Sequence, residues 1–141
     1  MQQMPDSETE INWDIIDDKC QTLNLEGMNL KGKVTKVYDG DTVHIVLPVF
    51  GGMYRWTCRI EGVDTPEIKS KNESEKEKAV IARNALSELI LNRLVKVKCG
   101  KLDKYGRLLV YIDHDGTDVS SWLIQNNYAY EYDGGTKKSW S

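Results

Sequence analysis

The chain contains few cysteines and no pattern that would pair them. Cys20, Cys58 and Cys99 are an odd number, and no C-x-x-C motif is present. Neither a disulfide framework nor a zinc knuckle is therefore indicated. A chain of 141 residues is long enough to bury a core without such cross-links. We expect one folded domain with three reduced, partly buried thiols.

Long apolar runs are also missing. No segment is long enough to span a bilayer, because a spanning helix needs about 20 apolar residues. The acidic start of the chain lacks the basic and apolar regions of a signal peptide. We expect an intracellular monomer with no membrane partner.

Several common catalytic and metal-binding motifs are absent. The sequence has no P-loop, no dinucleotide-binding fingerprint and no nucleophile elbow. The segment from Asp113 is not an EF-hand, which needs Gly at position six and Glu at position twelve. Those positions hold Asp118 and Ile124, so we interpret the segment as a turn in which Asp118 caps a helix. His44 and His114 lack a partner pattern and are expected on strand surfaces.

The charges are unevenly distributed. The net charge is −3, which by itself argues against nucleic acid as a partner. Residues 1–28, however, contain seven acids and one base, whereas residues 29–141 contain 15 acids and 18 bases. A mildly basic body behind an acidic leader is compatible with a phosphate-backbone partner. We therefore divide the chain into an acidic extension over 1–30 and a domain over 31–141.

The leader carries a helix signal. Ser7 and Glu10 fit a capping box, and Ile11, Ile15 and Ile16 follow at the spacing of one helical face. We predict a helix near 8–21.

From Gly32 onward the pattern changes to strands rich in Val, Ile and Thr. Asp39-Gly40 is a strong turn signal, and residues 70–78 are predicted to be a mobile surface loop. The predicted strands cover 33–38, 42–47, 53–61, 94–99 and 107–112, with one helix through 79–90 and a short one near 119–124. This order predicts a mainly β (α+β) fold: a five-stranded OB-type barrel with a helix after strand 3 and another after strand 5.

Three short segments contain the residues with the most distinctive chemistry. They are Asp39-Gly40-Asp41-Thr42, then Arg59-x4-Asp64-Thr65-Pro66-Glu67, then Asp103-Lys104-Tyr105-Gly106-Arg107. Carboxylates and a backbone carbonyl suit a hard cation such as Ca²⁺, and paired guanidiniums suit a phosphate. A metal beside two arginines is suited to cutting a phosphodiester. Each segment alone could be an ordinary turn or a solvated arginine, but their joint spacing favours a site.

Residues 31–130 resemble the staphylococcal nuclease (thermonuclease) family, and the resemblance rests on these three segments. The resemblance implies an OB-fold nuclease that uses one Ca²⁺ ion to hydrolyse DNA and RNA and leaves 3′-phosphate ends. By motif, Asp41, Asp64 and the Thr65 carbonyl would bind the metal, and Glu67 would orient or deprotonate the attacking water. Arg59 and Arg107 would hold the phosphate.

The resemblance also implies substrate contacts outside the catalytic motifs. Lys104 matches the family's lysine near the neighbouring phosphate, and the matching tyrosine is either Tyr130 or Tyr132. Tyr128, Tyr130 and Tyr132 alternate and could stack on a base or simply pack on the body. Because the groove reads the backbone rather than base edges, we expect little sequence specificity beyond a preference for flexible or A·T-rich strands. We expect DNA and RNA partners that are single-stranded or flexible. The alternative function is a non-catalytic OB-fold module that binds nucleic acid.

The chain departs from the family at its ends. The type member finishes in a long helix packed on the barrel, whereas this chain stops near where that helix would begin. We predict that the helix near 8–21 covers the exposed apolar surface instead, through Ile11, Ile15 and Ile16. Alternatively, the acidic leader competes with nucleic acid for the basic groove.

Overall fold

The computed structural model describes residues 10–140. Their helices are α1 (Glu73–Ile90) and α2 (Val119–Gln125), with a short 3-10 turn, η2 (Trp13–Ile15). The long strands are β1 (Asn29–Val37), β2 (Thr42–Val49), β3 (Gly52–Ile60), β5 (Leu94–Leu102) and β6 (Leu108–His114). The strands β4 (Val63–Asp64), β7 (Thr117–Asp118) and β8 (Tyr130–Glu131) have two residues each.

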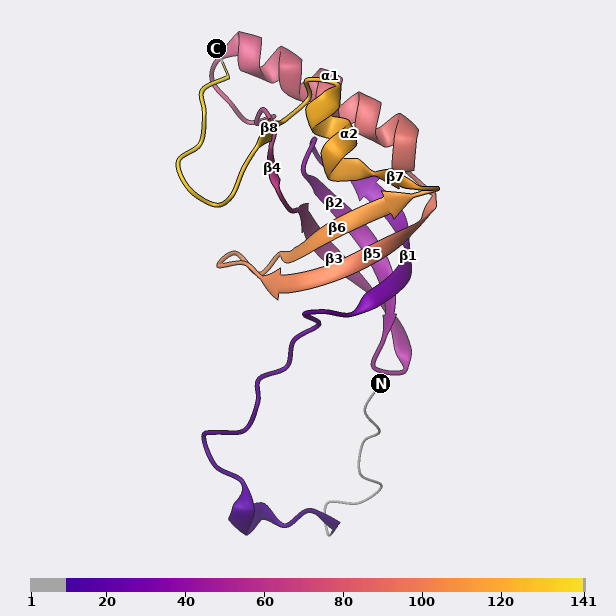
Figure 1. The fold of residues 1–141 in the computed structure, drawn as a ribbon, viewed down its shortest axis with the longest axis vertical. Coiled ribbons are helices and arrows are strands. Elements are labelled where there is room, and N and C mark those ends of the chain that lie inside the picture. Colours follow the sequence, from indigo (N-terminus) through magenta and orange to yellow (C-terminus); the bar gives the residue numbers. More distant parts are fainter. Residues whose placement is uncertain (1–9, 141) are drawn as a thin grey trace.

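The five long strands form a closed barrel. They pair in the order β3-β2-β1-β5-β6, and a parallel pairing of β3 with β6 closes the ring. All other pairings among them are antiparallel. With α1 after the third long strand and α2 after the fifth, this is the OB-type arrangement of helices and strands (Figure 1). The predicted fold class is confirmed.

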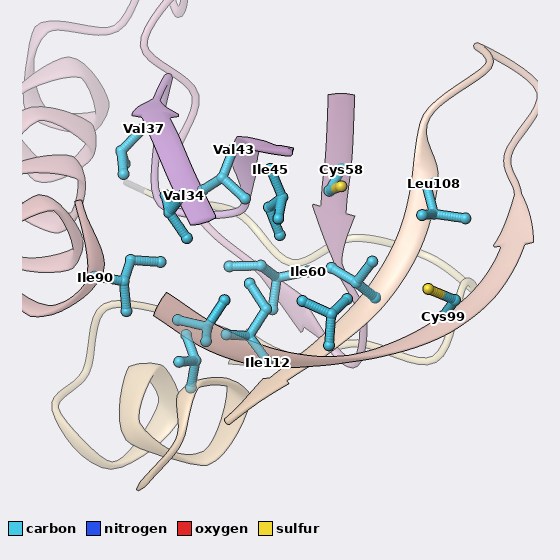
Figure 2. Packing of buried hydrophobic residues seen from close by; sticks show 14 of the residues in the cluster. Val34, Val37, Val43, Ile45, Cys58, Ile60, Ile90, Cys99, Leu108 and Ile112 are labelled. Atoms are coloured by element: carbon cyan, nitrogen blue, oxygen red, sulfur yellow. The ribbon is translucent and has the colours of Figure 1, made fainter. Parts of the chain in front are cut away.

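Alternation along the strands fills the barrel with aliphatic side chains. In β2, for example, Val43, Ile45 and Leu47 are fully buried, while the residues between them are partly exposed. Figure 2 shows side chains from several strands pointing toward one another, with Ile90 of α1 on one side of the cluster and Leu108 and Cys99 on the other. Cys58 and Cys99 belong to this core and are free thiols, whereas Cys20 is exposed. The expectation of a partly buried thiol is therefore wrong for Cys20.

Helix α1 begins earlier than the sequence pattern predicts. The Asn72 side chain accepts a hydrogen bond from the Glu75 amide, and Glu73 and Glu75 lie in the first turn. Both features stabilise a helix start, so the predicted loop over 70–78 is wrong from Glu73 onward. Ala79, Ala82, Leu86 and Ile90 form its buried face. In α2 the Asp118 carboxylate accepts from the Ser121 amide, as expected for a cap.

The predicted helix near 8–21 is absent from its described part. Residues 8 and 9 lie outside the described residues, and residues 11–21 contain no helix except the 3-10 turn η2. Trp13 and Ile15 are 62% and 76% exposed, and Figure 1 shows this segment extending away from the barrel. Leu25 is the first residue of the leader's described part that joins the core. Without a surface to pack on, a short amphipathic segment gains little from becoming helical, so the predicted covering role of Ile11, Ile15 and Ile16 is wrong. No helix in the described part of the chain is long and apolar enough to cross a membrane.

Candidate active site

The turn between β1 and β2 places Asp41 beside the segment that follows β3. Asp39 Oδ1 accepts hydrogen bonds from the amides of Asp41 and Thr42, at 3.0 and 2.8 Å. Gly40 is needed for proximity rather than for an unusual φ, since a Cβ there would lie 2.9 Å from Thr65 Cγ2. The motif residues Asp39 and Gly40 therefore let two chain segments approach closely.

Arg59, near the end of β3, stabilises the turn between β3 and β4 through hydrogen bonds from its guanidinium. Nη1 donates to the Ile60 carbonyl at 3.0 Å, and Nη2 donates to the Val63 carbonyl at 2.9 Å. Gly62 supplies the positive φ that this turn requires. Nη2 also lies 3.5 Å from Asp41 Oδ2. A guanidinium has five N–H groups, so donors remain for a ligand.

The loop between β5 and β6 orients Arg107. Asp103 Oδ1 accepts from the amides of Tyr105 and Arg107, and Oδ2 accepts from Arg107 Nε at 2.8 Å. Burial alone would raise the pKa of Asp103, but hydrogen bonds from Arg107 and Tyr105, with the Arg107 charge, hold that pKa below its usual value. The Asp103 carboxylate therefore stays ionised and holds the backbone amide and the Nε of Arg107 in place.

These three segments meet in one open pocket of about 400 Å³. It is lined, among others, by Asp41, Arg59, Asp64, Thr65, Glu67 and Arg107. Asp41, Arg59, Asp64 and Thr65 are at most 8% exposed, whereas the Glu67 side chain is 66% exposed. The structure therefore places all six residues named from the sequence around one space.

The remaining predicted contact residues lie next to this pocket. Lys104 and Tyr132 line an adjoining hollow that shares Arg59 and Arg107 with it. The Arg59 guanidinium lies over the Tyr132 ring, 5.6 Å from its centroid. Tyr130 is the partner of Asp64 in the β4–β8 ladder, so both tyrosines lie close to the carboxylate and arginine groups.

Negative charge is concentrated at the β1–β2 turn. Burial, followed by repulsion from the Asp41 carboxylate, raises the pKa of Asp39 to about 7. Arg59 offsets part of this charge, and the arrangement favours a further cation near Asp41.

The tail after β8 contacts the pocket, which the sequence did not indicate. It makes a wide loop and returns to the segment between β4 and α1 (Figure 1). Lys137 Nζ lies 3.3 Å from Asp64 Oδ1 and 3.9 Å from Glu67 Oε1. Trp140 Nε1 donates to Asp64 Oδ2 at 3.4 Å and its ring stacks on Tyr130. Nothing in the spacing of the tail residues points to Asp64, because the return depends on the path of the loop.

The pocket groups that could bind a metal ion are oxygen atoms. Among the described residues, no group of three or more His, Cys, Asp or Glu side chains lies close enough together to hold a metal ion. The pocket nevertheless offers two buried carboxylates, Asp41 and Asp64, and a buried Thr65 Oγ1 without a hydrogen-bond partner. The Lys137 ammonium at Asp64 shows that this position accepts a positive charge. Carboxylate and other oxygen ligands with room for water fit Ca²⁺, which takes six to eight of them.

Together, the barrel and this pocket define a small OB-type β-barrel protein with carboxylates and arginines around one open site. The chain belongs to the family described as "Staphylococcal nuclease homologue", whose model matches residues 57–139.

Three curated relatives illustrate the range of this similarity. The chain is 34% identical over 111 residues to Endonuclease YhcR of Bacillus subtilis, covering 72% of this chain and 9% of the relative. It is 32% identical over 108 residues to Endonuclease YncB of the same organism, covering 72% and 49%. It is 36% identical over 125 residues to Uncharacterized protein MJ1439 of Methanocaldococcus jannaschii, covering 72% and 58%. The chain therefore spans less than two thirds of each of these relatives.

Proposed function

We propose that this protein is a Ca²⁺-dependent nuclease that hydrolyses phosphodiester bonds of DNA and RNA and leaves 3′-phosphate ends. The observation that carries this proposal is the convergence of Asp41, Asp64, Arg59 and Arg107 on one open pocket. The endonuclease names of two relatives support it. We assign the activity to residues 31–141, with residues 1–30 as an acidic extension.

Asp41, Asp64 and the Thr65 carbonyl would hold the ion. When bound, a metal of this kind polarises a phosphoryl oxygen and helps to position a water molecule. The burial of both carboxylates is consistent with this role, because a buried carboxylate needs a compensating positive charge. Arg59 and Lys137 already supply such charges to Asp41 and Asp64 respectively.

The two arginines would bind the phosphate from fixed positions. Arg59 is held by two carbonyls and Arg107 by the Asp103 carboxylate. Donors that are oriented before the substrate arrives stabilise the charge that develops on the phosphate oxygens in the transition state. Glu67 is exposed at the pocket and would orient the attacking water or take its proton.

Lys104, Tyr130 and Tyr132 would bind the flanking nucleotides. They line hollows next to the pocket: Lys104 lies in the loop between β5 and β6, Tyr130 in β8, and Tyr132 directly after β8. An aromatic ring stacks on a base of any identity, which favours single-stranded or flexible substrates without sequence specificity. The site draws all its residues from one chain, and we propose that a monomer is active.

The test is cleavage of labelled single-stranded DNA and RNA in Ca²⁺, with and without a chelator. Glu67→Gln and Arg107→Ala are expected to lower the rate by about 10²–10³. Matched controls are Glu73→Gln and Arg83→Ala on α1, which remove the same groups from outside the pocket. Products with 3′-phosphates resist polymerase extension until they are treated with a phosphatase.

Each outcome of this experiment decides between the two candidate functions. Chelator-sensitive cutting that both pocket variants reduce, and both control variants retain, supports the nuclease. Binding without cutting would instead identify the protein as a non-catalytic module that binds nucleic acid.

A further inference from the structure

Positive charge is gathered on one continuous part of the barrel wall. The adjacent strands β3, β2, β1 and β5 contain no Asp or Glu. The same strands contain eight Lys and Arg residues, of which only Arg59 is buried: Lys31, Lys33, Lys36, Arg55, Arg59, Lys96, Lys98 and Lys101. In a chain whose net charge is −3, this separation creates a basic face outside the pocket.

Four of these lysines form a compact group, the β1–β5 lysine cluster: Lys31, Lys33, Lys96 and Lys98. The burial pattern of both strands points them outward, and Lys31 is the direct cross-strand partner of Lys96. Like charges placed opposite each other destabilise a sheet. Within residues 10–140, none of the four makes an ion pair or a side-chain hydrogen bond, so no direct ion pair offsets their repulsion. A bound polyanion would supply it.

A second observation concerns the electrostatic effect of the basic residues on β2, which lies between β3 and β1. Partial burial, then the charges of Arg55 and Lys36, lower the pKa of His44 on β2. The charges of Arg55 on β3 and Lys36 on β1 therefore act on the neighbouring strand β2.

The cluster borders a groove suited to a nucleotide chain. Lys31, Lys96 and Lys98 line an open groove of about 550 Å³ together with Tyr111, which is 42% exposed. Alternate residues on a strand lie about 6.7 Å apart, so the lysines present separate cations along the groove. An exposed ring beside spaced cations is the combination by which proteins bind single strands.

Two acids, Asp113 and Asp118, also line this groove. Asp113 is the cross-strand partner of Lys96, but its Oδ1 accepts from the Gly116 amide. Asp118 is the cap of α2 and accepts from Ser121. Both carboxylates are used within their own turns, and both lie on the β6–β7 side. The residues that line this groove are all different from those that line the catalytic pocket.

We propose that the β1–β5 lysine cluster and Tyr111 form a second binding site for the phosphate backbone of a single-stranded nucleic acid. This proposal depends on the proposed nuclease function in one respect, which is that the ligand of the site is a nucleic acid. The site holds a substrate strand at a distance from the pocket, so strands long enough to reach both bind more tightly than short ones.

The test measures binding alone, with the full chain in a chelator. A labelled 30-nucleotide single strand is titrated by fluorescence anisotropy at several salt concentrations. Lys31→Gln/Lys96→Gln is expected to weaken binding about fivefold to tenfold. It should also lower the slope of log affinity against log salt by about 1.4, from two lost phosphate contacts. Both side chains are exposed and repel each other, so a melting temperature that does not fall shows that the fold is intact.

The matched control is Lys76→Gln/Arg83→Gln on α1, which changes the net charge equally. It is expected to alter affinity by less than twofold. Native-like binding by the β1–β5 variant, or an equal loss in the control, would overturn the proposal. So would loss of binding to anionic phospholipid vesicles with unchanged binding to the oligonucleotide. Because the assay requires no cleavage, a protein that binds through this cluster but never cuts would refute the nuclease proposal and leave this one standing.

Discussion

The two pocket arginines should differ sharply in what they contribute to stability. Arg59 is buried and donates to two carbonyls of the turn after β3. Hydrogen bonds to a charged group contribute about 1.5–3 kcal/mol each. In Arg59→Lys the ammonium keeps the charge but is a single point, and it can replace only one of the two bonds. We expect a loss of about 2–3 kcal/mol in the free energy of unfolding.

Arg107→Lys is the matched comparison. The Arg107 side chain is 28% exposed, and its ion pair with Asp103 lies near the surface. Pairs of this kind contribute about 0–1 kcal/mol, and a lysine can form one as well. We therefore expect a loss of less than about 1 kcal/mol.

Urea unfolding of the full chain in a chelator, followed by tryptophan fluorescence, measures both values. If Arg59→Lys unfolds within 1 kcal/mol of the native protein, the guanidinium does not brace the turn and the reasoning is wrong. The same conclusion follows if Arg107→Lys costs as much as Arg59→Lys.

Three further predictions concern the barrel, the tail and the basic wall. Gly32→Ala should cost about 1–3 kcal/mol in thermal unfolding, because its Cβ would lie 2.9 Å from the Val46 carbonyl oxygen; native-like stability would contradict this. Lys137→Met should strengthen Ca²⁺ binding up to about fivefold in calorimetry, because the Lys137 ammonium competes with the ion for Asp64 and a half-exposed ion pair of this kind is worth at most about 1 kcal/mol. Weaker Ca²⁺ binding by the variant would show that Lys137 does not compete with the ion. His44 should titrate below its ordinary pKa of 6.5 by NMR. As pH falls below 6.5, the unfolded chain protonates this histidine more readily than the folded protein does, so His44 lowers the free energy of unfolding. His44→Gln should remove that part of the pH dependence. A His44 pKa above 6.5 would be inconsistent with the basic surroundings.

Much of the site's assembly follows from local chemistry that the sequence displays. Asp39 and Gly40 make a turn that approaches Thr65, and Asp103 folds back on the amides around Arg107. These interactions join residues that are close in sequence or adjacent to turns. The alternation of apolar residues likewise predicted the five long strands, with ends that differ by a few residues.

The leader shows where local pattern fails. Its capping box and isoleucine spacing predicted a helix, but residues 11–21 contain no helix except the 3-10 turn η2. An amphipathic pattern becomes a helix mainly when its apolar face packs against something, and the sequence alone does not say whether such a surface is nearby.

The sequence by itself determined the barrel, because strand periodicity and turn residues act over short distances. It also displayed the turn within each motif, and the order and spacing of the three motifs, with the family they resemble, predicted that their carboxylates and arginines share a pocket. Only the tertiary structure decided that Lys137 and Trp140 return to Asp64 and that the lysines of β1 and β5 face each other. Those contacts join residues far apart in the chain, and they depend on loop path and strand register, which no short window of sequence specifies.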